Sequence, residues 1–256
     1  AIANKEPLVA AGNLFLKAVK KSRSKIIPID SEHNAIFQML QNFDIKNVSS
    51  ITLTASGGPF WDDDLNEINK KKPEEALKHP NWVMGKKISI DSATMINKGL
   101  EIIEASVLFS LDSKKINVLV HPQSLVHGMI NLLDGSIISY ISEPDMRIPI
   151  FNALTWPKKI NSFKKIPKLS KLDFMEVNST KFPSVSISRK AMKKGLVASI
   201  VFSLFSCTNN VVLQADKEIG TAWHTDSLAT FHFQISDTLS VYSSELNIRH
   251  TIAYSY

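Results

Sequence analysis

The chain has 256 residues, of which 44% are hydrophobic and 21% charged, a composition typical of globular proteins that excludes a disordered or collagen-like chain. This length predicts one or two domains. Apolar stretches such as Leu196–Phe205 are well short of the ~20 residues that cross a bilayer, so no membrane partner is expected. The start, Ala1–Val9, lacks a signal-peptide pattern and an initiator Met, which suggests a fragment. The single Cys207 excludes an internal disulfide and favours a reducing compartment such as the cytoplasm.

The formal net charge of +6 is unevenly distributed. Residues 1–202 contain 28 Lys and Arg against 19 Asp and Glu, whereas residues 203–256 contain two against five. We therefore place a composition boundary near residue 203. The densest basic stretch, Lys158–Lys194, has the charge to neutralise nucleic-acid phosphates. No RNA- or DNA-binding motif accompanies it, so we favour a solvated linker or surface helix and expect no nucleic-acid partner.

The spacing of the apolar residues predicts alternating helices and strands. Helices are expected at 7–21, 33–41, 73–78 and 93–111, the last being the most strongly amphipathic. Strands are expected at 25–29, 50–54, 87–90 and 116–120, and a hairpin at 129–133 and 136–141 around Asp134-Gly135. These elements predict an α/β or α+β fold, a mixed sheet with flanking helices.

The nine glycines form neither a G-x-G-x-x-G pattern nor a Walker loop. A dinucleotide-binding unit needs glycines where its backbone approaches the pyrophosphate, so these residues show no nucleotide-binding domain of their own. Gly57-Gly58 is the one adjacent pair. The segment Ser56–Pro59 around it predicts either a phosphate-binding nest or an ordinary turn.

Two carboxylates, Asp30 and Glu32, follow a predicted strand and project the same way if the chain stays extended. Their hard oxygens suit Mg²⁺ or Mn²⁺. The alternative is a helix start, with Asp30 or Ser31 as the cap and Glu32 in the first turn, and the pattern alone favours it.

A third carboxylate, Glu101, shares a helix face with Asn97, Lys98 and Glu104. This face suits a phosphorylated, metal-chelating ligand with Lys98 on the phosphate, but a solvated face is the favoured alternative on pattern alone. Ser92, at the predicted start of that helix, adds a candidate anion site.

Three further features are open to a plain structural interpretation. His79-Pro80-Asn81-Trp82 and Met84-Gly85 resemble a mobile lid, or a surface loop with a half-buried Trp. His121 and His127 are interpreted as structural histidines.

Eight motifs in order support a more specific hypothesis. They are Ala3-Asn4-Lys5-Glu6, Pro28-Ile29-Asp30-Ser31-Glu32-His33-Asn34-Ala35-Ile36-Phe37-Gln38, Ser56-Gly57-Gly58-Pro59-Phe60, His79-Pro80-Asn81-Trp82, Asp91-Ser92-Ala93-Thr94-Met95, Asn97-Lys98-Gly99-Leu100-Glu101, His121-Pro122-Gln123-Ser124 and Glu143-Pro144-Asp145-Met146-Arg147. Together they closely resemble the 1-deoxy-D-xylulose-5-phosphate reductoisomerase family, over about residues 1–202.

The resemblance implies an enzyme that rearranges 1-deoxy-D-xylulose 5-phosphate and reduces it to 2-C-methyl-D-erythritol 4-phosphate, in non-mevalonate isoprenoid biosynthesis. It implies NADPH and a divalent metal, Mn²⁺ or Mg²⁺ with Co²⁺ as a further option. It also implies a homodimer joined through this domain, in the cytoplasm or, in a plastid-bearing cell, the plastid.

The resemblance also assigns roles to individual residues. It gives the metal to Asp30, Glu32 and Glu101, and catalytic roles to Lys5, Glu32 and His79. It gives the phosphosugar to Lys5, Ser31, Glu32, Ser56, His79, Ser92, Asn97, Lys98 and Glu101. It gives NADPH contacts to Asn4, Glu6 and Gly85, and the lid to Trp82 and Met84.

The sequence departs from the family in three places. The N-terminal NADPH domain has no counterpart here, the N-A-A-N-E motif is missing after Gly195, and Val83 replaces a lid residue that is commonly polar. We therefore expect a central catalytic domain at 1–155, a Lys-rich connecting segment at 156–202 and a tail without family resemblance at 203–256, for which disorder is one interpretation. The leading hypothesis is a partial enzyme. The alternative is a non-catalytic remnant or interaction module that retains the motifs.

Overall fold

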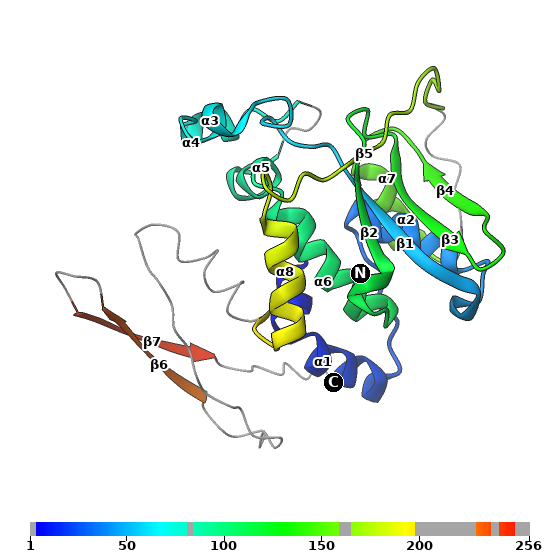
Figure 1. Cartoon of the computed structure of the whole chain (residues 1–256). Helices are drawn as coiled ribbons and strands as arrows, with labels where there is room; N and C mark the ends of the chain where they lie inside the picture. Colours follow the sequence, from blue (N-terminus) through cyan, green and yellow to red (C-terminus); the bar gives the residue numbers. More distant parts are fainter. Residues whose placement is uncertain (1–3, 81–83, 159–164, 198–228, 237–240, 249–256) are drawn as a thin grey trace. The chain divides into compact units, whose positions relative to one another are not determined.

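The computed structural model describes residues 4–80, 84–158, 165–197, 229–236 and 241–248. The chain divides into two units, residues 1–197 and residues 198–256 (Figure 1). The first unit holds every described residue to which the sequence assigns a role in binding or catalysis.

A five-stranded mixed sheet forms the centre of the first unit, in the order β4-β3-β1-β2-β5. Its strands are β1 (Val48–Ala55), β2 (Ile116–Val120), β3 (Val126–Leu132), β4 (Ile137–Ile141) and β5 (Met175–Glu176). The β1 and β2 strands are parallel, whereas β3, β4 and β5 each run antiparallel to their neighbour. The predicted mixed sheet with flanking helices is confirmed.

The described residues also form eight helices of four or more residues. They are α1 (Glu6–Ser22), α2 (Ser31–Leu40), α3 (Leu65–Ile68), α4 (Pro73–Ala76), α5 (Lys86–Ala93), α6 (Ile96–Phe109), α7 (Arg147–Thr155) and α8 (Ser184–Lys194). The α2 helix packs across β3, β4 and β1, while α6 packs against β2, β1, α1 and α8. No described helix has both the length and the apolar character needed to span a bilayer.

Burial on both faces of β1 explains why this strand is central. Ile51 and Leu53 are fully buried, and Thr52 and Thr54 between them are nearly so. The Thr54 hydroxyl donates a 2.5 Å hydrogen bond to the Val126 carbonyl, which satisfies its polar atom inside the sheet. Because β1 and β2 are parallel, their carboxyl ends lie at one edge, where Ser56 follows β1.

Two predicted strands are wrong. Residues 25–29 are extended but form no strand, and an isolated bridge at Pro28 is their one sheet-like pairing. Proline has no N–H to donate to a ladder, which limits pairing there. Residues 87–90 lie inside α5, where Ile88 and Ile90 imitate strand alternation. A 2.5 Å ion pair between Lys87 and Asp91, four residues apart, favours the helix instead.

The predicted hairpin is confirmed. The β3 and β4 strands pair antiparallel around Asp134 and Gly135. Gly135 has φ +88°, in the region that favours glycine, which is the property that made the turn predictable.

Part of the Lys-rich stretch is built into the first unit. The α8 helix packs along α6, where Gly99 leaves room for Ser188. In the second unit, β6 (Ala229–Ser236) and β7 (Val241–Ile248) form an antiparallel pair.

Candidate active site

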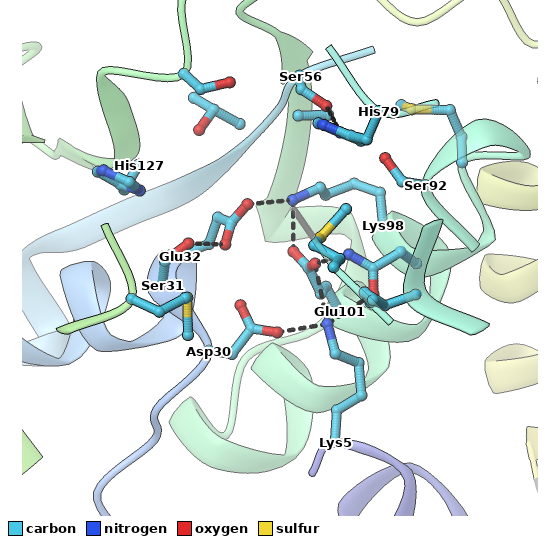
Figure 2. Close-up of a pocket in the computed structure, with 18 of the residues that line it drawn as sticks. Lys5, Asp30, Ser31, Glu32, Ser56, His79, Ser92, Lys98, Glu101 and His127 are labelled. Atoms are coloured by element: carbon cyan, nitrogen blue, oxygen red, sulfur yellow. Dashed lines mark hydrogen bonds and ion pairs between the residues drawn. The ribbon is translucent and has the colours of Figure 1, made fainter. Parts of the chain in front are cut away.

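A cavity of about 320 Å³ opens at the carboxyl end of β1. Residues from α2, α5, α6 and the loops after β1 line it (Figure 2). Every residue to which the sequence assigned a metal, catalytic or phosphosugar role lines this cavity: Lys5, Asp30, Ser31, Glu32, Ser56, His79, Ser92, Asn97, Lys98 and Glu101.

Asp30 occupies the N-cap position of α2, but its side chain makes no capping hydrogen bond. Its backbone carbonyl accepts from the Asn34 N–H, at 2.8 Å, as an N-cap carbonyl does. The carboxylate is therefore free of the capping role that the pattern favoured, and it pairs with the Lys5 ammonium instead. The Ser31 hydroxyl donates to Glu32 at 2.5 Å and fixes that second carboxylate.

The polar face of α6 is buried, so the solvated alternative is wrong. Lys98 is 4% exposed, Glu101 1% and Glu104 2%. The Glu101 carboxylate accepts hydrogen bonds from Asn97 at 2.5 Å, Lys5 at 3.0 Å and Lys98 at 2.6 Å. Buried charge of this kind persists only when it is paired, which these three donors achieve.

Two lysines hold three carboxylates together. Lys5 contacts both Asp30 and Glu101, while Lys98 lies 2.7 Å from Glu32 and 2.6 Å from Glu101. Dashed lines mark these contacts in Figure 2. Asp30, Glu32 and Glu101 each offer an oxygen within 4.8 Å of the other two. The cluster is thus a compact set of hard oxygen donors beside two cations.

Burial and charge act against each other on these groups. Burial disfavours the charged form of Asp30, but the Lys5 ammonium holds the pKa of Asp30 well below its ordinary value. Burial likewise opposes the charge on Lys5, yet Asp30 and Glu101 raise the pKa of Lys5 well above its ordinary value. Burial raises the pKa of Glu101, and Asp30 and Glu32 raise it further. The cluster therefore keeps Asp30 ionised and shifts Glu101 toward its protonated form.

The opposite side of the cavity has the features of an anion site. The Ser56 hydroxyl lies 2.9 Å from His79 Nε2 and accepts from the Gly58 N–H at 3.2 Å. Gly57 and Gly58 have φ of +92° and +70°, and a Cβ on Gly58 would lie 2.7 Å from the Ser92 carbonyl oxygen. Glycine is thus required where this turn meets α5.

Ser92 lines the cavity from a different place than predicted. It lies in the last turn of α5, because Met95, at φ +58°, separates α5 from α6. The predicted anion site at a helix start therefore does not apply to Ser92. Ser92 lines the same cavity as Asn97 and Lys98, which lie on the first turn of α6.

Comparison with known proteins identifies the family. A family model for the 1-deoxy-D-xylulose 5-phosphate reductoisomerase C-terminal domain matches residues 26–109, and one for the DXP reductoisomerase C-terminal domain matches residues 141–216. The 1-deoxy-D-xylulose 5-phosphate reductoisomerase of Pelodictyon phaeoclathratiforme is 46% identical over 235 residues, which are 90% of this chain and 60% of that protein. That of Clostridium novyi is 48% identical over 216 residues, 83% of this chain and 55% of that protein.

The chain belongs to the 1-deoxy-D-xylulose 5-phosphate reductoisomerase family. It spans between about half and 60% of the length of the relatives it matches. Solved reductoisomerases share the fold. A complex with NADPH, fosmidomycin and magnesium has a TM-score of 0.72 and 36% identity, covering 81% of this chain and 60% of that one. The Zymomonas mobilis enzyme in complex with NADPH has a TM-score of 0.69 and 42% identity, covering 77% and 52%.

The residues expected to contact NADPH in the reductoisomerase family do not line the cavity. Asn4 and Gly85 are exposed, and the Glu6 carboxylate pairs with Lys87 at 3.0 Å. That pair joins the start of α1 to the start of α5, so the three residues lie in one region of the surface. Of the two expected lid residues, Met84 lines the cavity and Trp82 lies outside the described residues.

Sequence reasoning missed part of this candidate site. His127, on β3, is buried and its ring nitrogen donates to the Ser142 carbonyl at 3.3 Å, as a structural histidine would, but it also lines the cavity, which was not predicted. His121 does not line the cavity and donates to the Asp173 carbonyl at 2.8 Å. Met146 also lines the cavity from the start of α7; the motif Glu143–Arg147 contains it, but no role was assigned to it.

Proposed function

We propose that this chain supplies the metal- and phosphosugar-binding part of an enzyme that converts 1-deoxy-D-xylulose 5-phosphate to 2-C-methyl-D-erythritol 4-phosphate. The reaction belongs to non-mevalonate isoprenoid biosynthesis and requires NADPH. One observation carries the proposal: three carboxylates and two lysines of the family's motifs meet in one cavity.

Asp30, Glu32 and Glu101 fit a divalent cation. They offer carboxylate oxygens alone, the donors that Mg²⁺ and Mn²⁺ prefer. Their three negative charges exceed the two positive charges of Lys5 and Lys98, so these five groups together keep a net negative charge that favours a cation. When bound, such a cation acts as a Lewis acid on the ketone and hydroxyl oxygens of the substrate. A solved relative is described as a magnesium complex, which supports this assignment.

The phosphate group of the substrate fits the side of the cavity that runs from Lys98, beside the carboxylates, to Ser56. Lys98 is a buried ammonium that pairs a phosphate as a point charge, and Asn97, Ser92 and Ser56 add hydrogen-bond donors. His79 lies against Ser56, so it also faces this side of the cavity. A solved relative in complex with fosmidomycin and magnesium is consistent with this arrangement.

Lys5, Ser31 and Glu32 lie on the carboxylate side of the cavity and serve the substrate hydroxyls. Glu32 accepts hydrogen bonds from the Ser31 hydroxyl at 2.5 Å and from the Lys98 ammonium at 2.7 Å, so its carboxylate is held where it can exchange a proton with a substrate hydroxyl. Lys5 donates to Asn97 and Glu101, and its ammonium stabilises negative charge at the same place.

Reduction and assembly belong to the whole enzyme. Asn4, Glu6 and Gly85 are the NADPH contacts we assign to this chain, and they share the surface region where Lys87 joins α1 to α5. NADPH supplies the hydride. The exposed edge strand β4, with Ile137 59% exposed, supports a homodimer through this domain. The single cysteine supports a cytoplasmic location.

Asp30→Asn tests the metal assignment. The substitution keeps the shape of the side chain and removes its charge, so we expect Mn²⁺ binding to be abolished in isothermal titration calorimetry. The matched control is Asp62→Asn, which changes an exposed aspartate and should bind Mn²⁺ as the wild type does. Unchanged Mn²⁺ affinity in Asp30→Asn would exclude the assignment.

A further inference from the structure

His33 lies completely buried behind the three-carboxylate cluster, one residue after Glu32 on α2. Its Nε2 atom is 2.9 Å from the Glu101 carbonyl oxygen. Its Nδ1 atom is 3.4 Å from Asp30 Oδ1 and 3.5 Å from Glu104 Oε2. One imidazole therefore contacts two of the three candidate metal-ligand residues.

The partners of His33 fix its hydrogen-bonding role. A carbonyl oxygen and an ionised carboxylate accept hydrogen bonds and cannot donate them. Both ring nitrogens of His33 therefore carry a proton and act as donors. Among the described residues, neither His33 Nδ1 nor Glu104 Oε2 has a hydrogen-bond partner within the ordinary distance. The contacts of His33 Nδ1 with Asp30 at 3.4 Å and with Glu104 at 3.5 Å are therefore ion pairs of the protonated ring rather than short hydrogen bonds.

Asp30 divides its two oxygens between different neighbours. Oδ1 faces His33, whereas Oδ2 contacts the Lys5 ammonium, which also contacts Glu101. The His33 ring is held in place by stacking on Phe109, with ring centres 6.3 Å apart and planes 14° apart. A carboxylate held at one oxygen by a fixed imidazole cannot rotate freely, so its other oxygen stays directed at the cluster.

The geometry points to Glu104 and His33 as positioning residues, which orient Asp30 so that its Oδ2 atom faces the other two carboxylates. Glu104 acts on Asp30 through the imidazole, and neither residue is needed as a ligand. This inference rests on the metal site proposed above. Residues that orient a ligand in this way typically change metal affinity by roughly 10- to 100-fold when they are substituted.

Mn²⁺ titration of the full 256-residue chain tests the inference. Glu104→Gln keeps the shape of the side chain and removes its charge, and His33→Asn keeps a donor near the Nδ1 position while losing the Glu101 contact. Each should raise the Mn²⁺ dissociation constant by roughly 10- to 100-fold. The control is His121→Asn, which alters an equally buried histidine outside the cavity. It should lower the melting temperature and leave Mn²⁺ affinity unchanged.

Three results would overturn the inference. They are wild-type Mn²⁺ affinity in both Glu104→Gln and His33→Asn, an equal loss of affinity in His121→Asn, or two Mn²⁺ ions bound per chain. The last would favour a direct ligand role for His33 and Glu104, since their ligand atoms and that of Asp30 also lie within 4.8 Å of one another.

A second measurement needs no metal. Urea unfolding of Asp30→Asn, Glu104→Gln and the double variant forms a cycle that reports the coupling between the two carboxylates. Coupling through His33 predicts non-additive changes in the free energy of unfolding, whereas additive changes would contradict it. If the wild-type chain fails to bind Mn²⁺, the proposed metal site fails, and additive changes in this cycle would still exclude coupling between Glu104 and Asp30.

Discussion

Lys98 combines two tasks at the scale of a single residue. Its ammonium forms ion pairs with both Glu32 and Glu101 and so offsets the repulsion between the two carboxylates. It also lies beside the hydroxyl and amide groups of the proposed phosphate site. Burial opposes this charge, but Glu101 and Glu32 raise the pKa of Lys98 above its ordinary value. The lysine therefore stays charged over the whole working pH range.

Lys98→Met removes this charge and keeps most of the stem. A hydrogen bond to a charged group is worth about 2 kcal/mol, so 1-deoxy-D-xylulose 5-phosphate should bind roughly 30-fold more weakly. Calorimetry in the presence of Mn²⁺ measures this change. Lys165→Met is the control, because Lys165 is 79% exposed and pairs with Glu143. Equal substrate affinity in Lys98→Met and the wild type would refute the phosphate role.

His79 provides a pH-dependent prediction. Burial lowers the pKa of His79 below its ordinary value of 6.5. Because the unfolded chain binds this proton more readily, the contribution of His79 to stability is present above pH 6.5 and is lost as the pH falls. An NMR titration of the His79 ring should show a midpoint below 6.5. A midpoint at or above 6.5 would show that burial does not control this imidazole.

At the scale of elements, α6 carries the site because both of its faces are covered. Asn97, Lys98 and Glu101 face the cavity, while Gly99 faces α8. A Cβ on Gly99 would lie 2.3 Å from the Ser188 Oγ atom and 3.1 Å from the Ser184 carbonyl oxygen. The close approach of α8 thus depends on glycine at this position.

Gly99→Ala should have two opposing effects on the free energy of unfolding. Alanine favours a helix by about 1 kcal/mol over glycine, but overpacking costs about 1–3 kcal/mol. The clash involves a side chain on a packed helix, so we expect a net loss in the free energy of unfolding, measured in urea. Adding Ser188→Gly should restore part of it. A Gly99→Ala chain that is more stable than the wild type would show that α8 does not pack as described.

The elements also show how far sequence reasoning reaches. The hairpin was predictable because Asp134-Gly135 favours a tight turn and an apolar run lies on each side of it. Residues 87–90 were not, because Ile88 and Ile90 alternate as in a strand while the Lys87–Asp91 pair acts over one helical turn.

The candidate site was only partly predictable for a related reason. The motif resemblance indicated Lys5 and Glu101, but the contact between Lys5 and Asn97 joins residues 92 positions apart and depends on tertiary packing. The alignment of Glu104 with His33 depends on how α6 packs near α2, which no local pattern encodes.

For the whole molecule, the division into two units predicts where binding resides. Every residue that lines the cavity belongs to residues 1–197. A chain that ends at Val197 should therefore bind Mn²⁺ with the affinity of the full chain, by calorimetry. A large loss of affinity in a truncated chain that is still folded, as judged by circular dichroism, would show that residues 198–256 contribute to the site.

The central claim is that this cavity binds a divalent cation and a phosphosugar together. The most direct test is the melting temperature of the full chain, titrated with Mn²⁺ in the presence and absence of 1-deoxy-D-xylulose 5-phosphate. A ligand that binds the folded state alone stabilises it, by about 2.7 kcal/mol at a concentration 100 times its dissociation constant. We predict a saturable rise with Mn²⁺ that the substrate enlarges. A cooperative transition that neither ligand moves would contradict the account and favour a chain that retains the family's motifs without its binding function.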